Sequence, residues 1–178
     1  ALEEDVKTKK KTGIAAISLK DGDELAAVTL VKDEPLVLIT GKGMGIKFNS
    51  MDVSATSRAN SGVKGMGLNE DDYVVAALPI RNPQDSLAIF SECGLGKKID
   101  LNELVTQKRG GKGIICYKTS EKTGDVTGTA LISDEDNLLV CGLTNSICIS
   151  ATEVPLATRV SLGNQILKGT KLLSVTKV

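Results

Sequence analysis

The chain has 178 residues, of which 41% are hydrophobic, so it can build a folded core and is not globally disordered. The 22 lysines and arginines balance the 22 aspartates and glutamates, and the absence of histidine removes the commonest general base and zinc ligand. No apolar run approaches the ~20 residues of a membrane span, and residues 1–12 are too polar for a signal peptide. We therefore expect a soluble, cytoplasmic protein.

The residue types favour strands over helices. The apolar residues are mainly Val, Ile, Leu and Ala, and eighteen glycines indicate many tight turns. The four cysteines, Cys93, Cys116, Cys141 and Cys148, contain no C-x-x-C pair, and two of them lie within apolar runs. We interpret them as small core residues of a reducing compartment, with no disulfide or metal role.

Four similar segments begin at glycines that are 49, 51 and 50 residues apart, namely Gly13, Gly62, Gly113 and Gly163. A cation precedes each glycine by four residues: Lys9, Arg58, Arg109 and Arg159. This regular spacing indicates a tandem repeat. It predicts one domain over residues 1–178 with units at about 13–61, 62–112 and 113–162, while residues 163–178 start or complete another unit.

Each unit is expected to hold about four short strands. In the first unit these are Ile14–Ser18, Glu24–Val31 after an Asp-Gly turn, Leu36–Thr40 and Met44–Phe48. Later strands are expected at Asp72–Pro79, Ser86–Ser91, Leu95–Ile99, Asp125–Ile132, Leu138–Gly142 and Ile147–Ser150, with short helical turns at Ser50–Val53, Leu101–Leu104 and Thr152–Val154.

A repeat of about 50 residues with four strands is typical of a propeller blade. The expected fold is therefore all-β, with propeller-like β-pinwheel blades of about four antiparallel strands. A closed ring needs at least four blades, so we expect a partial array of roughly three to four blades.

Charges gather at equivalent places in the repeats. Cations stand before the repeat glycines and on the strand after each Gly-rich turn, for example at Lys42, Lys47, Lys97 and Lys98. Anions gather in the hairpin turns, for example at Asp21–Glu24 and Glu70–Asp72. In a blade array such positions align, so the neutral total can conceal a basic stripe suited to the phosphates of a duplex. The plain alternative is that these lysines are ordinary solvated residues.

One segment carries a specific resemblance. Gln107-Lys108-Arg109-Gly110-Gly111-Lys112-Gly113 matches the box Q-[RK]-R-G-G-[RK]-G at all seven positions. The stretches at 16–25, 58–63, 94–99 and 121–126 are also similar to the same family. On these motifs the chain resembles the C-terminal domain of type IIA topoisomerase A subunits, gyrase in particular.

The resemblance implies a β-pinwheel whose blades exchange strands and which binds, bends and wraps duplex DNA without sequence preference. In the gyrase holoenzyme, such wrapping supports ATP-dependent negative supercoiling. The implied partners are double-stranded DNA, a second A subunit, and the B subunit of gyrase, with no membrane and no small-molecule substrate. No cofactor is expected in this chain, because ATP and Mg²⁺ act elsewhere in the holoenzyme. The implied DNA-binding residues are Lys42, Lys47, Arg58, Lys97, Lys98, Gln107, Lys108, Arg109, Gly110, Gly111, Lys112, Gly113 and Arg159.

Two departures leave alternatives open. In the family the box lies in the first blade, whereas here it follows two repeat starts, so it is either the functional box or its equivalent in a later blade. The third unit has Thr144, Ser146 and Cys148 where its predecessors have Gly, Gly and Lys, and we expect it to bind DNA weakly. The other functions considered are a topoisomerase IV A-subunit domain that steers substrate choice, and a propeller that only binds proteins.

A catalytic function is not expected. Tyr73 and Tyr117 lie in strand-like runs and are interpreted as packing residues. The Gly-rich segment Gly41–Gly45 lacks the G-x-x-x-x-G-K-[ST] spacing of a phosphate-binding loop and is interpreted as a hairpin turn.

Overall fold

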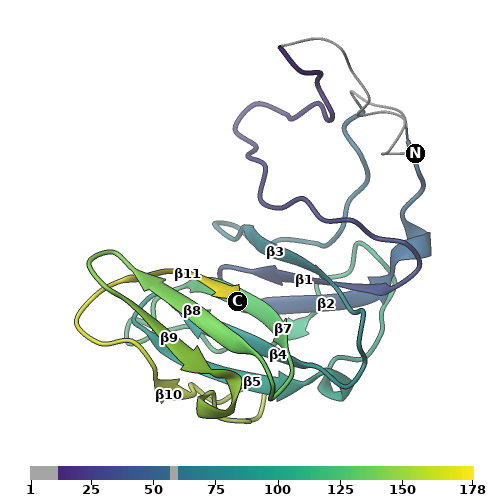
Figure 1. Cartoon of the computed structure of the whole chain (residues 1–178). Coiled ribbons are helices and arrows are strands. Elements are labelled where there is room, and N and C mark those ends of the chain that lie inside the picture. The colour runs from purple at the N-terminus through teal and green to yellow at the C-terminus, as the bar shows by residue number, and fades with distance from the viewer. Residues whose placement is uncertain (1–11, 57–59) are drawn as a thin grey trace.

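Antiparallel strands dominate the computed structural model, which describes residues 12–56 and 60–178 (Figure 1). Two sheets of four strands and one of three are formed. The strands are β1 (Pro35–Thr40), β2 (Met44–Asn49), β3 (Val74–Pro79), β4 (Ser86–Ser91), β5 (Leu95–Asp100), β6 (Ile114–Ile115), β7 (Val126–Ile132), β8 (Asn137–Gly142), β9 (Ser146–Ser150), β10 (Asn164–Gln165) and β11 (Leu172–Lys177). The predicted all-β fold is confirmed, and the strands predicted from Leu36 onward lie within one or two residues of those observed.

The strands of one sheet do not all come from the same repeat unit. The first sheet has the order β3-β1-β2-β6, the second β10-β5-β4-β7 and the third β11-β8-β9. Each four-stranded sheet therefore takes its two middle strands from one unit, one edge strand from the next unit and the other edge strand from the unit after that. The expectation that one unit forms one blade was wrong, whereas the exchange of strands implied by the family resemblance is present.

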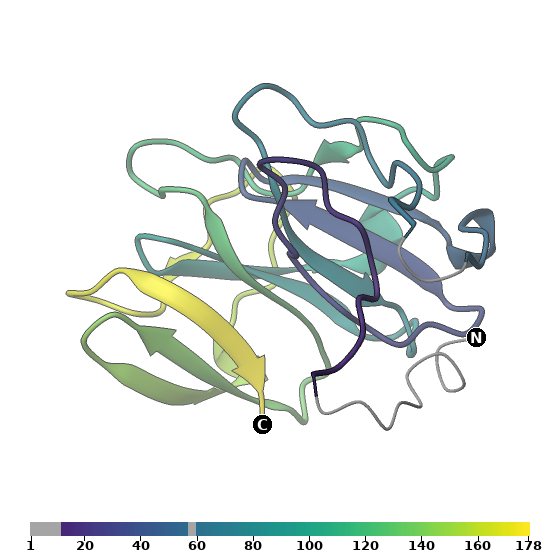
Figure 2. The ribbon, with the colours of Figure 1, turned by 90° about the horizontal axis from the view of Figure 1, so that it is seen from above.

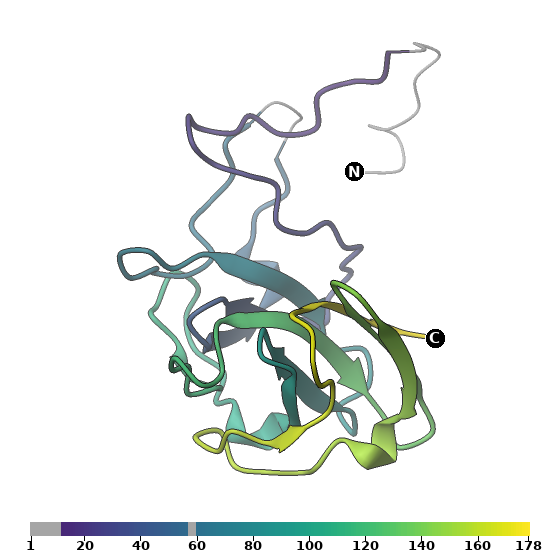
Figure 3. The same cartoon turned by 90° about the vertical axis from the view of Figure 1, so that its left-hand side faces the viewer.

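The two strands predicted first in the chain are not formed. Residues 13–31 contain no strand, and Val28 and Leu30 are 81% and 70% exposed. Segment 24–31 is one repeat upstream of β3, which pairs with β1 of the preceding unit. The described residues contain no β1-type strand that could pair with segment 24–31 in the same way. Figures 1 and 3 show this segment standing beyond β3, away from the sheets.

The core lies between neighbouring sheets. One cluster joins the first two sheets and includes Val37, Ile39, Leu87 and Ile89, all 0% exposed. A second cluster joins the second and third sheets, and the third sheet lies at the end of the array farthest from β1 and β2 (Figure 2). The edge strands β3, β7 and β11 also contact one another in turn. These three strands form the inner edges of the blades, so β6, β9 and β10 lie on the outer edges.

A short helical turn follows the outermost long strand of each sheet, as predicted. The turns are η1 (Ser50–Asp52), η2 (Leu101–Glu103) and η3 (Ala151–Glu153). A capping side chain precedes each turn, since Asn49, Asp100 and Ser150 accept a hydrogen bond from the amide two residues later. After η2 and η3 the chain crosses to the outer edge of the preceding sheet, where it forms β6 and β10. We call these stretches the crossing segments.

Candidate nucleic-acid interface

The box Gln107–Gly113 lies on the crossing segment at the outer edge of β2. The amide of Gln107 donates to the carbonyl of Lys47 at 2.8 Å. The glycine pair lies against segment 64–67, because Gly110 donates to the carbonyl of Gly65 and Gly67 donates to the carbonyl of Gly111, both at 2.8 Å. Two backbones thus run together at the rim with only hydrogen atoms as side chains at these positions, which permits close approach of a large partner.

The last glycine of the box fixes where the crossing segment meets the sheet. Gly113 has a φ of +75°, and a Cβ there would lie 2.3 Å from the carbonyl oxygen of Gly45. One repeat later, Gly163 has a φ of +77° and the same relation to Gly96, at 2.2 Å. Both positions therefore require glycine for close packing and for backbone conformation. Two of the four repeat glycines, Gly113 and Gly163, are thus the points where the crossing segments dock.

Three exposed lysines surround the paired backbones of the box. Lys108 and Lys112 are box residues, and Lys64 comes from the neighbouring segment that pairs with it. Within residues 12–56 and 60–178, none of the three forms a salt bridge or a side-chain hydrogen bond. Lys64 was not predicted from the sequence, because the cations considered either precede the repeat glycines or follow the Gly-rich turns between strands, and Lys64 follows Gly62 by two residues.

Arg109 of the box and its repeat equivalent, Arg159, both direct their guanidinium groups to acceptors within the protein. Arg109 donates from Nη1 to the carbonyl of Lys64 at 2.5 Å and from Nε to the carbonyl of Asp52 at 3.0 Å. Arg159 donates from Nη1 to the carbonyl of Ile115 at 2.8 Å, and its Nε lies 3.6 Å from a carboxylate oxygen of Glu103. Both arginines are only partly exposed.

The strand lysines are also engaged by the protein. Lys97 is 0% exposed, and its Nζ donates to the carbonyls of residues 158, 159 and 161. Lys98 is 8% exposed and donates to the carbonyl of Ala151 at 3.1 Å and to the Asp134 carboxylate at 2.5 Å. The expectation that Lys97 and Lys98 contact phosphates was wrong, because their ammonium groups are buried against oxygen acceptors. Lys47 is half-buried and donates to the carbonyl of Leu101 at 3.0 Å, and burial lowers its pKa.

Lys42 lies apart from the box, in the turn between β1 and β2. Its Nζ forms an ion pair with Asp125 at 2.9 Å, and this hydrogen bond raises the pKa of Lys42. Tyr73 lies beside the same carboxylate, with 3.4 Å between its hydroxyl and Asp125 Oδ2. Lys42 is thus already neutralised by a neighbour of opposite charge. Arg58, the remaining predicted cation, lies outside the described residues.

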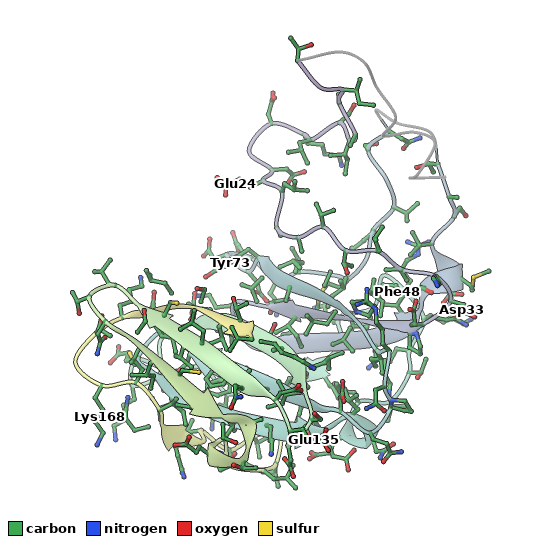
Figure 4. All side chains as sticks on the ribbon, viewed as in Figure 1. Glu24, Asp33, Phe48, Tyr73, Glu135 and Lys168 are labelled. Atoms are coloured by element: carbon green, nitrogen blue, oxygen red, sulfur yellow. The ribbon has the colours of Figure 1, made fainter. Side chains whose placement is uncertain are left out.

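The acidic turns lie together. Asp23 and Glu24 from the first acidic turn line one surface hollow with Asp72 and Tyr73 from the second. Figure 4 shows Glu24 on the segment beyond Tyr73. The two acidic turns thus share one surface. One acidic residue does lie near the box, because Asp52 lines a separate hollow with Lys108 and Arg109.

The described residues offer no metal-binding group of three or more His, Cys, Asp or Glu side chains. Tyr117 is buried, as predicted, and donates to the carbonyl of Leu162 at 2.7 Å, whereas Tyr73 is 48% exposed and covers Gly41 with its ring. Of the two cysteines within apolar runs, Cys116 is buried and Cys141 is partly buried, whereas Cys93 and Cys148 are exposed. Among the described residues, no helix has the length and hydropathy to cross a membrane.

Comparisons with known proteins agree with one another. A family described as "DNA gyrase C-terminal domain, beta-propeller" matches residues 2–32, 34–81 and 85–133. The DNA gyrase A subunit of Lawsonia intracellularis is 39% identical over 163 residues, which are 89% of this chain and 20% of that protein. The DNA gyrase A subunit of Clostridium acetobutylicum is 37% identical over 174 residues, covering 95% and 21%. The chain thus spans about a fifth of the length of these relatives.

Two solved structures share the fold. A structure of the DNA gyrase A C-terminal domain matches with a TM-score of 0.86 and 33% identity, covering 94% of this chain and 58% of that one. The C-terminal domain of a DNA topoisomerase IV matches with a TM-score of 0.91 and 25% identity, covering 97% and 55%. The backbone fold of this chain is thus shared by both kinds of domain, whereas its sequence is more similar to that of the gyrase domain than to that of the topoisomerase IV domain.

Proposed function

Because the chain belongs to the family of DNA gyrase C-terminal domains, we propose that it binds and bends duplex DNA without sequence preference, as part of a gyrase A subunit. The observation that carries this proposal is the box. Two glycine-containing backbones lie side by side at the outer edge of the first sheet, flanked by the exposed amines of Lys64, Lys108 and Lys112. Exposed amines without protein partners can neutralise phosphates, and glycines let the duplex approach closely.

Such a site recognises the backbone of DNA and carries no base readout. The supporting residues are lysines, which bind phosphate as flexible point charges, and the arginines that could form forked contacts with guanine are engaged by carbonyls. Binding is therefore expected to depend on salt and to be insensitive to sequence.

The test is a titration of labelled duplexes with the chain at several salt concentrations. If Lys64, Lys108 and Lys112 each neutralise one phosphate, log K falls against log salt with a slope of about −3. Replacing Lys108 and Lys112 together with Ala should reduce the magnitude of this slope by about two. Lys168, an exposed lysine on the loop before β11 (Figure 4), serves as the matched control. A strong preference for one duplex sequence, or an equal loss from Lys168→Ala, would contradict the proposal.

In the holoenzyme, the same binding would present a bent segment to catalytic gates on other domains and support ATP-dependent negative supercoiling. We place no catalytic step on this chain. The expected setting is the bacterial cytoplasm, and the expected protein partners are a second A subunit, together with the B subunit of gyrase. The topoisomerase IV alternative rests on the TM-score of 0.91 to that domain. A supercoiling assay on relaxed plasmid with the reconstituted holoenzyme separates the two, since only gyrase introduces negative supercoils.

A further inference from the structure

The same lysine link between blades occurs twice. Lys47 on β2 of the first sheet donates to the carbonyl of Leu101, the first residue of η2, which ends the second blade. Lys98 on β5 of the second sheet donates to the carbonyl of Ala151, the first residue of η3, which ends the third blade. The two donors, Lys47 and Lys98, are one repeat apart, and so are the two acceptors, Leu101 and Ala151. This link is therefore a feature of the repeat and not an accident of one turn.

A second link, made by arginine, also occurs twice. Arg109 and Arg159 occupy equivalent positions four residues before a repeat glycine. Each donates from Nη1 to the carbonyl two residues after the preceding repeat glycine, which is Lys64 for Arg109 and Ile115 for Arg159. Arg159 thus joins the two crossing segments, and Arg109 joins the first crossing segment to segment 64–67.

These links act where they have most effect on blade orientation. Neighbouring blades already contact through β3, β7 and β11 at their inner edges. The outer edges are formed by β2 with β6 and by β5 with β10, and the lysine and arginine links lie there. The buried clusters between the sheets hold neighbouring blades together. Hydrogen bonds at the outer edges lie farthest from the inner-edge contacts, so they constrain the angle between two blades most strongly.

We propose that Lys47, Lys98 and Arg159 are positioning residues that fix the angle between successive blades and so set the curvature imposed on bound DNA. The effect on DNA curvature rests on the proposed function, whereas the link between blades does not depend on it. Main-chain carbonyls accept from these cations, so the cations shape the path of the duplex without contacting phosphate. Lys64, Lys108 and Lys112 remain as the phosphate contacts.

The first experiment compares Lys47→Met with Lys108→Met in the 178-residue chain. A duplex labelled at both ends reports bending by energy transfer at saturating protein, and a salt series reports the number of phosphates neutralised. We expect Lys47→Met to lower the energy transfer and leave the salt slope unchanged. Lys108→Met should reduce the magnitude of the slope by about one. Lys47→Arg retains a donor and should restore the wild-type bend. A reduced slope for Lys47→Met, or an unchanged bend, would overturn the proposal.

The second experiment needs no DNA and separates this inference from the proposed function. Cys93 lies between β4 and β5 in the second blade, and Cys148 lies on β9 in the third; both are exposed. Spin labels on these two thiols, with Cys141 replaced by Ser, report the distance between the blades that Lys98 connects. Lys98→Met should broaden or shift the distance distribution, and an unchanged distribution would overturn the link. Should Lys98→Met not fold, Lys98→Gln, whose shorter side chain lacks the ammonium group, replaces it under the same criterion.

Discussion

The ammonium group of Lys97 lies 5.1 Å from the centroid of the Tyr117 ring, beneath the turn formed by residues 158–162. Its Nζ donates to the carbonyls of Thr158, Arg159 and Ser161 at 2.8, 2.5 and 2.9 Å. One repeat earlier, the apolar side chain of Ile46 lies beside Gly111 of the box. The glycine-rich box turn and its glycine-poor equivalent therefore rest on different supports, one apolar and one cationic.

Replacing Lys97 with Met should lower the free energy of unfolding by about 2–4 kcal/mol. Methionine fills a similar volume but leaves three carbonyls facing a buried space without a donor, and each unsatisfied group is costly. Urea unfolding followed by circular dichroism measures the change. Lys168→Met, at an exposed position, should change the free energy by less than about 0.5 kcal/mol. Equal stability of Lys97→Met and wild type would show that the carbonyls do not depend on the ammonium group.

The stability that Lys97 confers should depend on pH. Burial lowers the pKa of Lys97 to about 8, from the 10.5 of an exposed lysine. Between these values the unfolded chain keeps a proton that the folded chain has lost, so the free energy of unfolding rises with pH. This increment, up to about 3 kcal/mol, is added to whatever Lys97 contributes at neutral pH; it is complete above pH 10.5 and is lost as the pH falls through 8.

Other groups also titrate in this range, so the measurement is the difference in free energy of unfolding between wild type and Lys97→Met. That difference should widen as the pH rises from 8 towards 10.5. A difference that stays constant or narrows would show that the pKa of Lys97 is not lowered in the folded chain.

The cysteines should separate by reactivity in the folded chain. Cys93 and Cys148 are exposed, whereas Cys116 is buried and burial raises its pKa to about 12. Because the thiolate is the reactive form, iodoacetamide at pH 8 should modify the two exposed thiols and leave Cys116 intact. Peptide mass spectrometry gives the modified positions, and labelling in urea should then reach Cys116. Modification of Cys116 at a rate similar to Cys93 without denaturant would disprove its protected position.

Two glycines with the same backbone conformation should respond differently to alanine. Gly113 and Gly169 both have a φ of +75°, but a Cβ meets the carbonyl oxygen of Gly45 at 2.3 Å only in the first case. Gly169→Ala should cost about 1 kcal/mol from backbone strain alone, and Gly113→Ala several kcal/mol because the crossing segment must move away from the sheet. Thermal unfolding of the two variants checks the ranking, and similar midpoints would contradict it.

The sequence predicted β1 to β5, β7 to β9 and all three helical turns, because these elements depend on local features; it did not predict β6, β10 and β11. Alternating apolar residues, turn glycines and capping side chains such as Asn49 and Asp100 act within a few residues. The sheet that a strand joins is not a local property. The segment Val74–Pro79 has the same pattern whether it pairs within its own unit or with β1 of the preceding one, so only the folded chain decided its partner.

The same distinction applies to the candidate site. The sequence by itself determined the family, through the box Gln107–Gly113, and the repeat glycines, of which Gly113 and Gly163 dock the crossing segments. It could not separate Lys97 from Lys108, since both are lysines at repeated positions near Gly-rich turns. Only the tertiary structure placed the carbonyls of three distant residues around Lys97 and left Lys108 in solvent. The charge of a lysine is set by its chemistry, but what that charge binds depends on which acceptors the fold brings within reach.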